Sequence, residues 1–315
     1  MDIDFLLWLQ NLRNAVNSPE LDRFMQLVSD FGVSYSIFIF AFVYWCISKR
    51  GGLYIIASYT FGRMLNGLIK LVACVYRPWI RDARIIPAGN AIETATGYSF
   101  PSGHTLIATI ILGGNGALLR KAGYKLLSLL FFALVLLVGF SRNYLGVHTP
   151  QDVVVGLLVG MFTLWALSKV FNYVDNHRSS ENLFLILAFV ICAAIFVYVN
   201  NKNFPMDYDA NNKLIVDPAK MLRDIWKAAG LVIGFILGRF IEKYFIKFKP
   251  SGFKIVSIIL AVIGIVIYGY INMVFQKIAT GQFGHYYGRM LSGFTGMFFV
   301  MAVWPAVIKI FQGNK

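Results

Sequence analysis

The chain has 315 residues, of which 58% are hydrophobic and only 14% are charged, and its mean hydropathy is +0.65. A soluble protein of this length cannot bury so much apolar surface, so the composition argues against a soluble globular domain and favours a polytopic membrane protein. The formal net charge of +14 does not indicate nucleic-acid binding, because the basic residues lie mostly in short links between apolar runs.

Residues 1–32 mix apolar and polar side chains ahead of the first long apolar run. They predict two amphipathic helices that lie on the membrane surface, the second of them started by Pro19. Apolar runs of about 20 residues follow, and each run is long enough to cross a bilayer as a helix. The sequence therefore predicts an all-α membrane bundle of nine transmembrane helices, at 33–49, 53–76, 103–120, 124–141, 150–170, 182–200, 223–243, 254–276 and 288–311.

Basic residues concentrate in alternate links between these runs, at 48–52, 120–125, 169–178 and 239–254. Short basic links stay in the cytoplasm, so we expect an outer N-terminus and a cytoplasmic C-terminus in the plasma membrane. We expect three parts: surface helices in 1–32, a core of five spans in 33–175, and four further spans of unknown role in 176–315.

The second expected span ends in KLVACVYRP. Lys70 and Arg77 are seven residues apart, which predicts two cations on one helix face near the outer end, before Pro78 stops the helix. Taken alone, Arg77 is better explained as an interfacial anchor. Lys70 lies deeper and needs an anionic partner.

The third expected span begins PSGHTLIATI. Ser102 and Gly103 stand where a helix exposes unpaired backbone N–H groups, which attract anions, and Gly103 lets an anion approach the backbone. His104 follows directly. An ordinary N-cap is the simpler interpretation of this segment by itself.

The fourth span ends and the fifth begins in SRNYLGVHTPQDVVVG. Thr149, Pro150 and Asp152 match a helix start, so Asp152 is explained equally well as a capping carboxylate. However, His148 stands four residues before Asp152, and a carboxylate there can orient an imidazole and stabilise its cation.

Alternating topology places these four helix ends on the same side of the membrane. The residues expected to converge there are Lys70, Arg77, Ser102, His104, Arg142, His148 and Asp152. Three cations with backbone N–H groups suit a tetrahedral dianion, and two histidines suit a nucleophile and an acid. No acidic cluster for magnesium and no phosphate-binding glycine loop is present in the sequence. The constellation predicts phosphoryl transfer through a phosphohistidine, without metal or other cofactor.

These three motifs, KLVACVYRP, PSGH and SRNYLGVHTPQD, resemble the signatures of the type-two phosphatidic acid phosphatase superfamily. That superfamily includes membrane lipid phosphatases, undecaprenyl-diphosphate phosphatases, glucose-6-phosphatase and vanadium haloperoxidases. The resemblance covers roughly residues 60–165. It implies that His148 attacks phosphorus and that Asp152 orients it, while His104 protonates the leaving oxygen. The phosphoryl group would be bound by Lys70, Arg77, Arg142, Ser102 and the Gly103 backbone.

Four further residues are candidates for contact with a substrate head group. Arg81 and Arg84 follow the first motif closely, and pairing with Asp82 or with lipid explains them equally well. His285 and Arg289 lie at the outer end of the last expected span, where interfacial anchoring is the simpler interpretation.

The sequence thus predicts an integral membrane phosphatase that hydrolyses a lipid-borne phosphomonoester or diphosphate, of the polyprenyl diphosphate or phosphatidate type. Two alternatives use the same chemistry: a lipid phosphotransferase with an alcohol as acceptor, and a sugar-phosphate phosphatase resembling glucose-6-phosphatase. A transporter or channel is disfavoured, because we find no clear repeat or broken mid-membrane helix. The expected partners are membrane lipid and a lipid-phosphate substrate, with no nucleic acid and no obligate protein partner.

Overall fold

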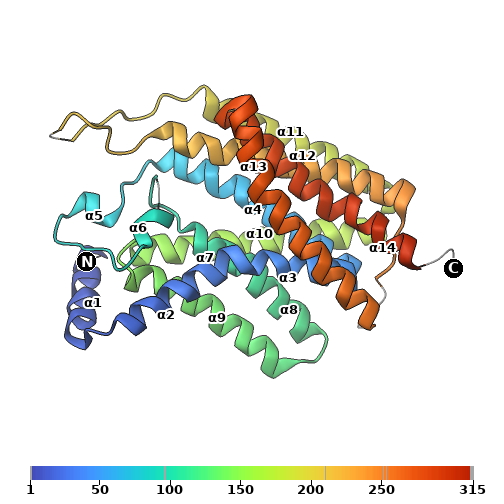
Figure 1. Ribbon diagram of the computed structural model, residues 1–315, viewed down its shortest axis with the longest axis horizontal. Coiled ribbons are helices and arrows are strands. Elements are labelled where there is room, and N and C mark those ends of the chain that lie inside the picture. Colours follow the sequence, from blue (N-terminus) through green and yellow to red (C-terminus); the bar gives the residue numbers. More distant parts are fainter. Residues whose placement is uncertain (1, 96, 210, 251, 253, 313–315) are drawn as a thin grey trace. The chain divides into compact units, whose positions relative to one another are not determined.

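A computed structural model describes residues 2–95, 97–209, 211–250, 252 and 254–312. All the regular elements in these ranges are helical, which confirms the all-α prediction (Figure 1). The α-helices are α1 Asp2–Val16, α2 Pro19–Asp30, α3 Ser36–Phe42, α4 Lys49–Ala73, α5 Pro78–Arg81, α6 Ala91–Thr94, α7 Gly103–Ala108, α8 Gly114–Lys121, α9 Lys125–Tyr144, α10 Pro150–Asn176, α11 Glu181–Asn200, α12 Pro218–Ile241, α13 Ile255–Phe298 and α14 Trp304–Gln312. Five π-helical turns, Phe31–Tyr35, Val43–Ile47, Thr109–Gly113, Glu242–Ile246 and Phe299–Val303, and a 3-10 turn, Arg178–Ser180, complete the described elements.

Each of the nine expected spans falls on helix, but nine membrane crossings are not confirmed. By length and composition, four helices of the described chain could cross a membrane, or up to five if one bent pair counts as a span. The four are Lys125–Tyr144, Pro150–Asn176, Arg178–Asn200 and Ile255–Phe311. Helix α4 is long as well, but it carries Lys49, Arg50, Arg63 and Lys70. Cations at these positions lower the hydropathy that identifies a span.

The residues form two compact units, each drawn from separated parts of the sequence. Unit 1 comprises 1–37, 65–164 and 202–221, and unit 2 comprises 38–64, 165–201 and 222–315. All the residues of the three motifs therefore belong to unit 1. The three-part division expected from the sequence stays a prediction.

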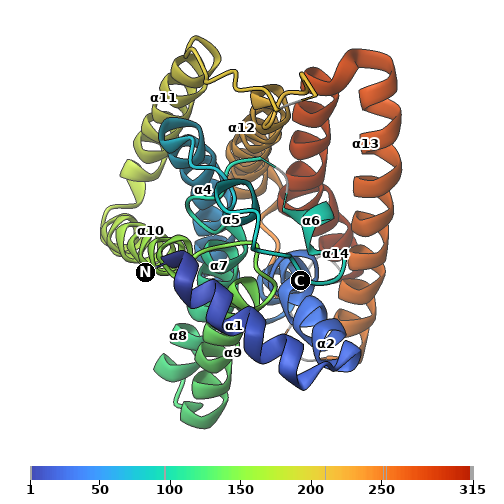
Figure 2. The same cartoon turned by 90° about the vertical axis from the view of Figure 1, so that its left-hand side faces the viewer.

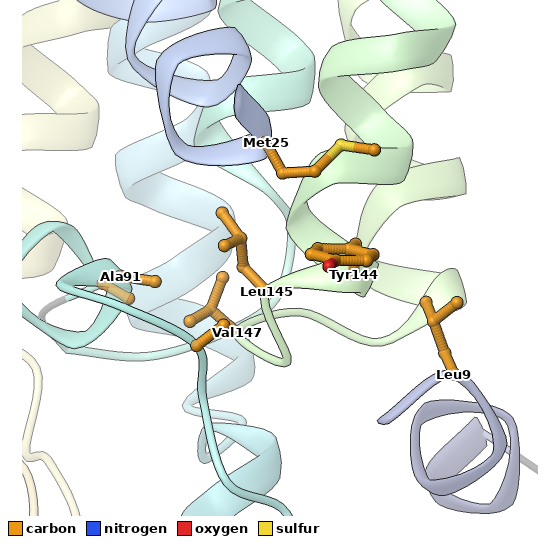
Figure 3. Packing of buried hydrophobic residues seen from close by; sticks show 8 residues of the cluster. Leu9, Met25, Ala91, Tyr144, Leu145 and Val147 are labelled. Atoms are coloured by element: carbon orange, nitrogen blue, oxygen red, sulfur yellow. The ribbon is translucent and has the colours of Figure 1, made fainter. Parts of the chain in front are cut away.

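The two N-terminal helices form where the sequence predicts them, and their place on the membrane surface stays a prediction. Ser18 caps α2 by accepting a hydrogen bond from the Leu21 amide, and Pro19 occupies the first turn. Their apolar faces meet the segment between α9 and α10 in one buried cluster (Figure 3). The residues labelled there are Leu9, Met25, Ala91, Tyr144, Leu145 and Val147. Helices α1 and α2 therefore pack against the chain segment that leads into His148.

Glycines let α10 pack directly against the start of α7. A Cβ on Gly156 would lie 2.6 Å from the carbonyl oxygen of Ser102, and one on Gly160 would lie 2.7 Å from Cβ of Thr109. Contacts that short do not occur between real side chains, so only glycine allows this spacing. The helix starts that carry PSGH and HTPQD consequently touch.

In unit 2, α13 turns back on itself. Gly284 has φ 77° and ψ 170°, which interrupts the helix, and the two limbs run side by side in opposite directions (Figure 2). A Cβ on Gly264 would lie 2.3 Å from Nε1 of Trp304, and one on Gly296 would lie 3.3 Å from the ring of Tyr268. The two expected spans at 254–276 and 288–311 correspond to these limbs.

Unit 2 also contains a paired ionic network. Arg239 donates to Glu181 at 2.6 Å and to Glu242 at 2.6 Å. Lys49 also donates to Glu242, whose side chain is fully buried, and Lys243 pairs with Glu181 at 2.9 Å. Each cation in this network therefore has a carboxylate partner.

Candidate active site

The first motif changes direction between its two cations, which corrects the sequence prediction. Helix α4 ends at Ala73, and Cys74 has φ 49°. Arg77 then adopts an extended conformation (φ −66°, ψ 152°) and precedes α5. A residue before proline disfavours the helical region, so Pro78 keeps Arg77 extended. The prediction that Lys70 and Arg77 share one helix face was wrong.

Lys70 is buried and fixes the loop that leads to the second motif. Its Nζ donates to the carbonyl oxygens of Tyr98 at 2.7 Å and Ser99 at 2.9 Å. The ammonium group is thus held at the segment just before Ser102.

His148 lies in the turn between α9 and α10, with a different neighbour at each ring nitrogen. Its Nε2 is 2.8 Å from Nη1 of Arg77, and its Nδ1 is 3.2 Å from Oδ2 of Asp152. A guanidinium can only donate and a carboxylate can only accept. Both neighbours therefore favour the tautomer with the proton on Nδ1 and the lone pair on Nε2.

Asp152 combines both roles that the sequence left open. Its Oδ2 accepts from the Thr149 amide at 2.9 Å, and its own amide donates to Oγ1 of Thr149 at 3.3 Å, which is a reciprocal helix cap. The same oxygen faces Nδ1 of His148 and accepts from Oγ of Ser99 at 2.5 Å. Capping the helix therefore places the carboxylate beside the imidazole.

The surroundings keep the imidazole of His148 neutral. Burial lowers the pKa of His148 well below its usual value, and the charges of Arg77, Lys70 and Arg142 lower it further. Burial also lowers the pKa of Arg77, to about 10, so this guanidinium still carries its charge at neutral pH. The site thus combines an uncharged ring with fixed cations.

Arg142 is a buried cation with two unused donors. Its Nη1 donates to Oγ of Ser29 at 2.5 Å, whereas its buried Nε and Nη2 have no hydrogen-bond partner in the described chain. Asp30 lies within electrostatic range of this guanidinium. Leaving charged donors unpaired in the interior costs free energy, unless a ligand accepts from them. Anion binding by Arg142 stays a prediction, and these two donors are compatible with it.

The second motif supplies the helix start that faces these groups. Ser102 caps α7 by accepting from the Thr105 amide at 3.4 Å, and its own amide donates to the carbonyl oxygen of Asp152 at 2.9 Å. The half-buried His104 is within electrostatic range of four site residues: Arg142, His148, Arg77 and Lys70. A Cβ on Gly103 would lie 3.3 Å from Nδ2 of Asn66, so glycine keeps this helix start close to α4.

Three neighbours of the site were missed in the sequence. Ser99 bonds to Asp152, Asn143 Nδ2 donates to the carbonyl oxygen of His148 at 2.8 Å, and Asn66 lies beside Gly103. Ser99 and Asn143 stand inside or next to the motifs, but a polar residue in a loop gives no indication of its partner. Asn66 lies one helical turn before Lys70, and that spacing was a usable signal.

Three of the four candidate head-group residues, Arg81, Arg84 and Arg289, have protein partners. Arg81 pairs with Asp2 at 3.0 Å, and Arg84 pairs with Asp82 at 2.6 Å. The hydrogen bonds from Arg84 lower the pKa of Asp82 to about 2. In unit 2, Arg289 pairs with Asp224 at 3.1 Å and His285 is exposed. Their contact with substrate stays a prediction.

Comparison with known proteins supports the resemblance of the motifs. The chain matches the PAP2 superfamily over residues 51–176 and the transmembrane extension of PAP2 superfamily phosphatases over residues 226–314. No solved structure matches the chain.

Three curated relatives each match about half of the chain. Undecaprenyl-diphosphatase of Sulfolobus acidocaldarius is 31% identical over 163 residues, which is 50% of this chain and 75% of that protein. Phosphatidylglycerophosphatase B of Bacillus subtilis is 27% identical over 168 residues, 50% of this chain and 78% of the relative. Glucose-6-phosphatase catalytic subunit 1 of Haplochromis nubilus is 28% identical over 196 residues, 55% of each chain.

The motifs assemble around one imidazole, and the matches cover both the motif region and the helices that follow it. The relatives named above are phosphatases. The chain therefore belongs to the PAP2 superfamily and is an integral membrane phosphatase, a hydrolase of phosphoric esters.

Proposed function

We propose that this phosphatase hydrolyses a lipid-borne phosphomonoester or diphosphate through a phosphohistidine formed at Nε2 of His148. The observation that carries the proposal is the arrangement around that atom. Its lone pair faces Arg77 at 2.8 Å, while Asp152 holds the opposite side of the ring. A cation next to this nitrogen can bind an anionic phosphoryl group, and the free lone pair of the nitrogen can then attack phosphorus.

In the first step, Nε2 attacks phosphorus and the bond from phosphorus to the leaving oxygen breaks. Arg77 moves from Nε2 to the phosphoryl oxygens, and Arg142 offers its Nε and Nη2 donors. His104 protonates the leaving oxygen, and the carboxylate of Asp152 stabilises the positive charge that develops on the imidazole.

In the second step, water attacks phosphorus and the bond to Nε2 breaks. His104, now neutral, takes the proton of the attacking water. The products are the dephosphorylated lipid and inorganic phosphate, and the His148 lone pair is restored. Lys70 contributes a fixed charge and holds the Ser99 segment in place.

A lipid substrate is favoured by the membrane setting and by the names of two relatives. Undecaprenyl-diphosphatase and phosphatidylglycerophosphatase B are named for lipid phosphates. We place the active site on the outer side of the plasma membrane, on the topology argument from the basic links. Substrate choice depends on residues outside the motifs, so polyprenyl diphosphate and phosphatidate are both candidates.

The test is trapping of the intermediate on the purified full-length chain with labelled substrate and rapid denaturation. We expect an acid-labile, base-stable phosphoryl adduct on His148, and the His148→Ala variant should lose at least about 10³-fold in kcat. His177→Ala is the matched control, because His177 is an exposed histidine outside the motifs. Retained turnover or an undiminished adduct in His148→Ala would disprove the nucleophile assignment.

The substrate class follows from a phosphate-release screen with polyprenyl diphosphate, phosphatidate, phosphatidylglycerophosphate and glucose 6-phosphate. We expect the highest kcat/KM with one of the lipids. A higher value for glucose 6-phosphate would overturn the lipid assignment while leaving the phosphohistidine in place.

A further inference from the structure

A second group of basic side chains lies in unit 2, away from the three motifs in the sequence. It consists of Arg63 on α4, Arg223 and Lys227 on α12, and Arg289 on α13. Lys227 is within electrostatic range of Arg63, Arg289 and Asp224. Arg223 precedes Lys227 by four residues on α12, so both project from the same helix face. Three helices thus direct positive charge to one place.

The charges in this group are incompletely balanced. Arg289 pairs with Asp224 at 3.1 Å, and Lys227 donates to a neutral group, Oε1 of Gln276, at 2.9 Å. Arg63 makes no hydrogen bond or ion pair with any residue that the structure describes, and the buried Nε of Arg223 has no partner there either. Partly buried guanidinium groups without acceptors favour the binding of an external anion.

The helices that carry these residues are packed tightly, so the cations cannot easily separate. A Cβ on Gly293 would lie 2.3 Å from the carbonyl oxygen of Lys227, and one on Gly230 would lie 1.9 Å from that of Met290. The rings of Phe61 and Phe235 join α4 to α12, with centroids 6.1 Å apart. The arrangement of charge is therefore built into the fold of unit 2.

Aromatic rings on α12 and α13, the helices that carry three of these cations, favour one class of anion. Trp226, the neighbour of Lys227, stacks edge-on against Tyr287 and Phe196, each with centroids 4.9 Å away, and lies 5.4 Å from Tyr286. Trp and Tyr concentrate at the level of lipid head groups. Arginine binds phosphate oxygens through its planar fork of donors.

We propose that Arg63, Arg223, Lys227 and Arg289 form a second anion site, which holds the phosphate group of an anionic phospholipid. The site is separate in sequence from the catalytic motifs and does not depend on the phosphohistidine mechanism. Its occupant is recognised through the phosphate, with the surrounding rings at the level of the head group.

The experiment measures thermal stabilisation of the full-length chain in detergent micelles, because a ligand that binds the folded state raises its melting temperature. Phosphatidylglycerol, phosphatidylcholine and inorganic phosphate are titrated separately. We expect phosphatidylglycerol to stabilise the chain and phosphatidylcholine to do so weakly. The half-saturating concentration of phosphatidylglycerol should rise about tenfold in Arg63→Gln and in Lys227→Gln, as expected for loss of one strong charge contact.

Lys277→Gln is the control, because Lys277 is an exposed cation on α13 outside the group, and it should titrate like the natural chain. Stabilisation by inorganic phosphate that falls in the same variants would assign the site to free phosphate instead of lipid. The proposal would be overturned if the half-saturating concentrations of phosphatidylglycerol and of inorganic phosphate were the same in the natural chain, in Arg63→Gln and in Lys227→Gln. If a variant does not fold, native mass spectrometry of the natural chain decides: preferential retention of phosphatidylglycerol supports the site, and equal retention of the two lipids refutes it.

Discussion

The proposed catalytic cluster of unit 1 contains Arg77, Arg142, His148 and Asp152. This cluster and the ionic network of unit 2 use buried charge in opposite ways. In the network, Arg239 and Lys49 have carboxylate partners, and the fully buried Glu242 bonds to both. In the proposed catalytic cluster, two donors of Arg142 have no partner among the described residues, and the carboxylate of Asp152 is directed to His148. Paired buried charges hold a structure together, whereas unpaired ones of a single sign are arranged for a ligand.

The sharpest test of this contrast is the replacement of Asp152, because its carboxylate faces Nδ1 of His148, the proposed nucleophile, at 3.2 Å. If Asp152 orients and stabilises the imidazole, Asp152→Asn should lower kcat by about 10³–10⁴-fold with little change in stability. If Asp152 is only a helix cap, the variant should lose about 1 kcal/mol of stability and keep its turnover. Turnover per folded molecule and melting temperature are measured on the same preparation.

A second test replaces one arginine from each region. Arg142→Gln should reduce kcat/KM by about 10²–10³-fold, because donors for the phosphoryl oxygens are lost. Arg239→Gln should instead destabilise the chain by about 3–5 kcal/mol, since it leaves Glu242 buried with one partner fewer. The rate of phosphate release per folded molecule should fall mainly in Arg142→Gln, and the melting temperature should fall mainly in Arg239→Gln. If both variants lose activity in proportion to the folded fraction, the distinction between the regions fails.

The smallest expected effect is on the pH dependence. Burial, and then the charges of Arg77, Lys70 and Arg142, lower the folded-state pKa of His148. The ring therefore stays neutral from pH 6.5 down to this lowered pKa. The acid limb of kcat/KM due to His148 should therefore lie well below pH 6.5. Between the lowered pKa and 6.5 the unfolded chain binds more protons than the folded one, so this residue makes stability decrease as the pH falls through that window. A pH profile for the Lys70→Met variant should show the limb moved upward, because one opposing charge is gone.

The three motifs were sufficient to predict that Arg77, His148 and Asp152 lie together, and their catalytic roles stay predictions. Capping by Thr149 and Asp152 and by Ser102 was likewise readable, since caps depend on local residues. The course of Arg77 was mispredicted, because helical spacing was continued past Cys74 and the effect of Pro78 on the preceding residue was overlooked.

Other features depended on contacts between distant segments. Ser99 could not be assigned to Asp152 without the fold, and the approach of Arg63 to Lys227 on α12 lies outside any local pattern. The number of membrane crossings was read from apolar runs alone, while cations within α4 and the break at Gly284 complicate that reading.

The N-terminal helices have a consequence for how the catalytic part of such enzymes is delimited. Arg13 donates to the carbonyl oxygens of Tyr144 and Ile86, Asp22 accepts from the Tyr144 hydroxyl, and Ser29 accepts from Arg142. The N-terminal partners Arg13, Asp22 and Ser29 lie before residue 51, where the match to the family begins. A fragment cut to the matched region would carry every motif residue and still lack Ser29, which holds the proposed phosphate-binding Arg142, so the residues that position the motifs begin well ahead of the recognisable signature.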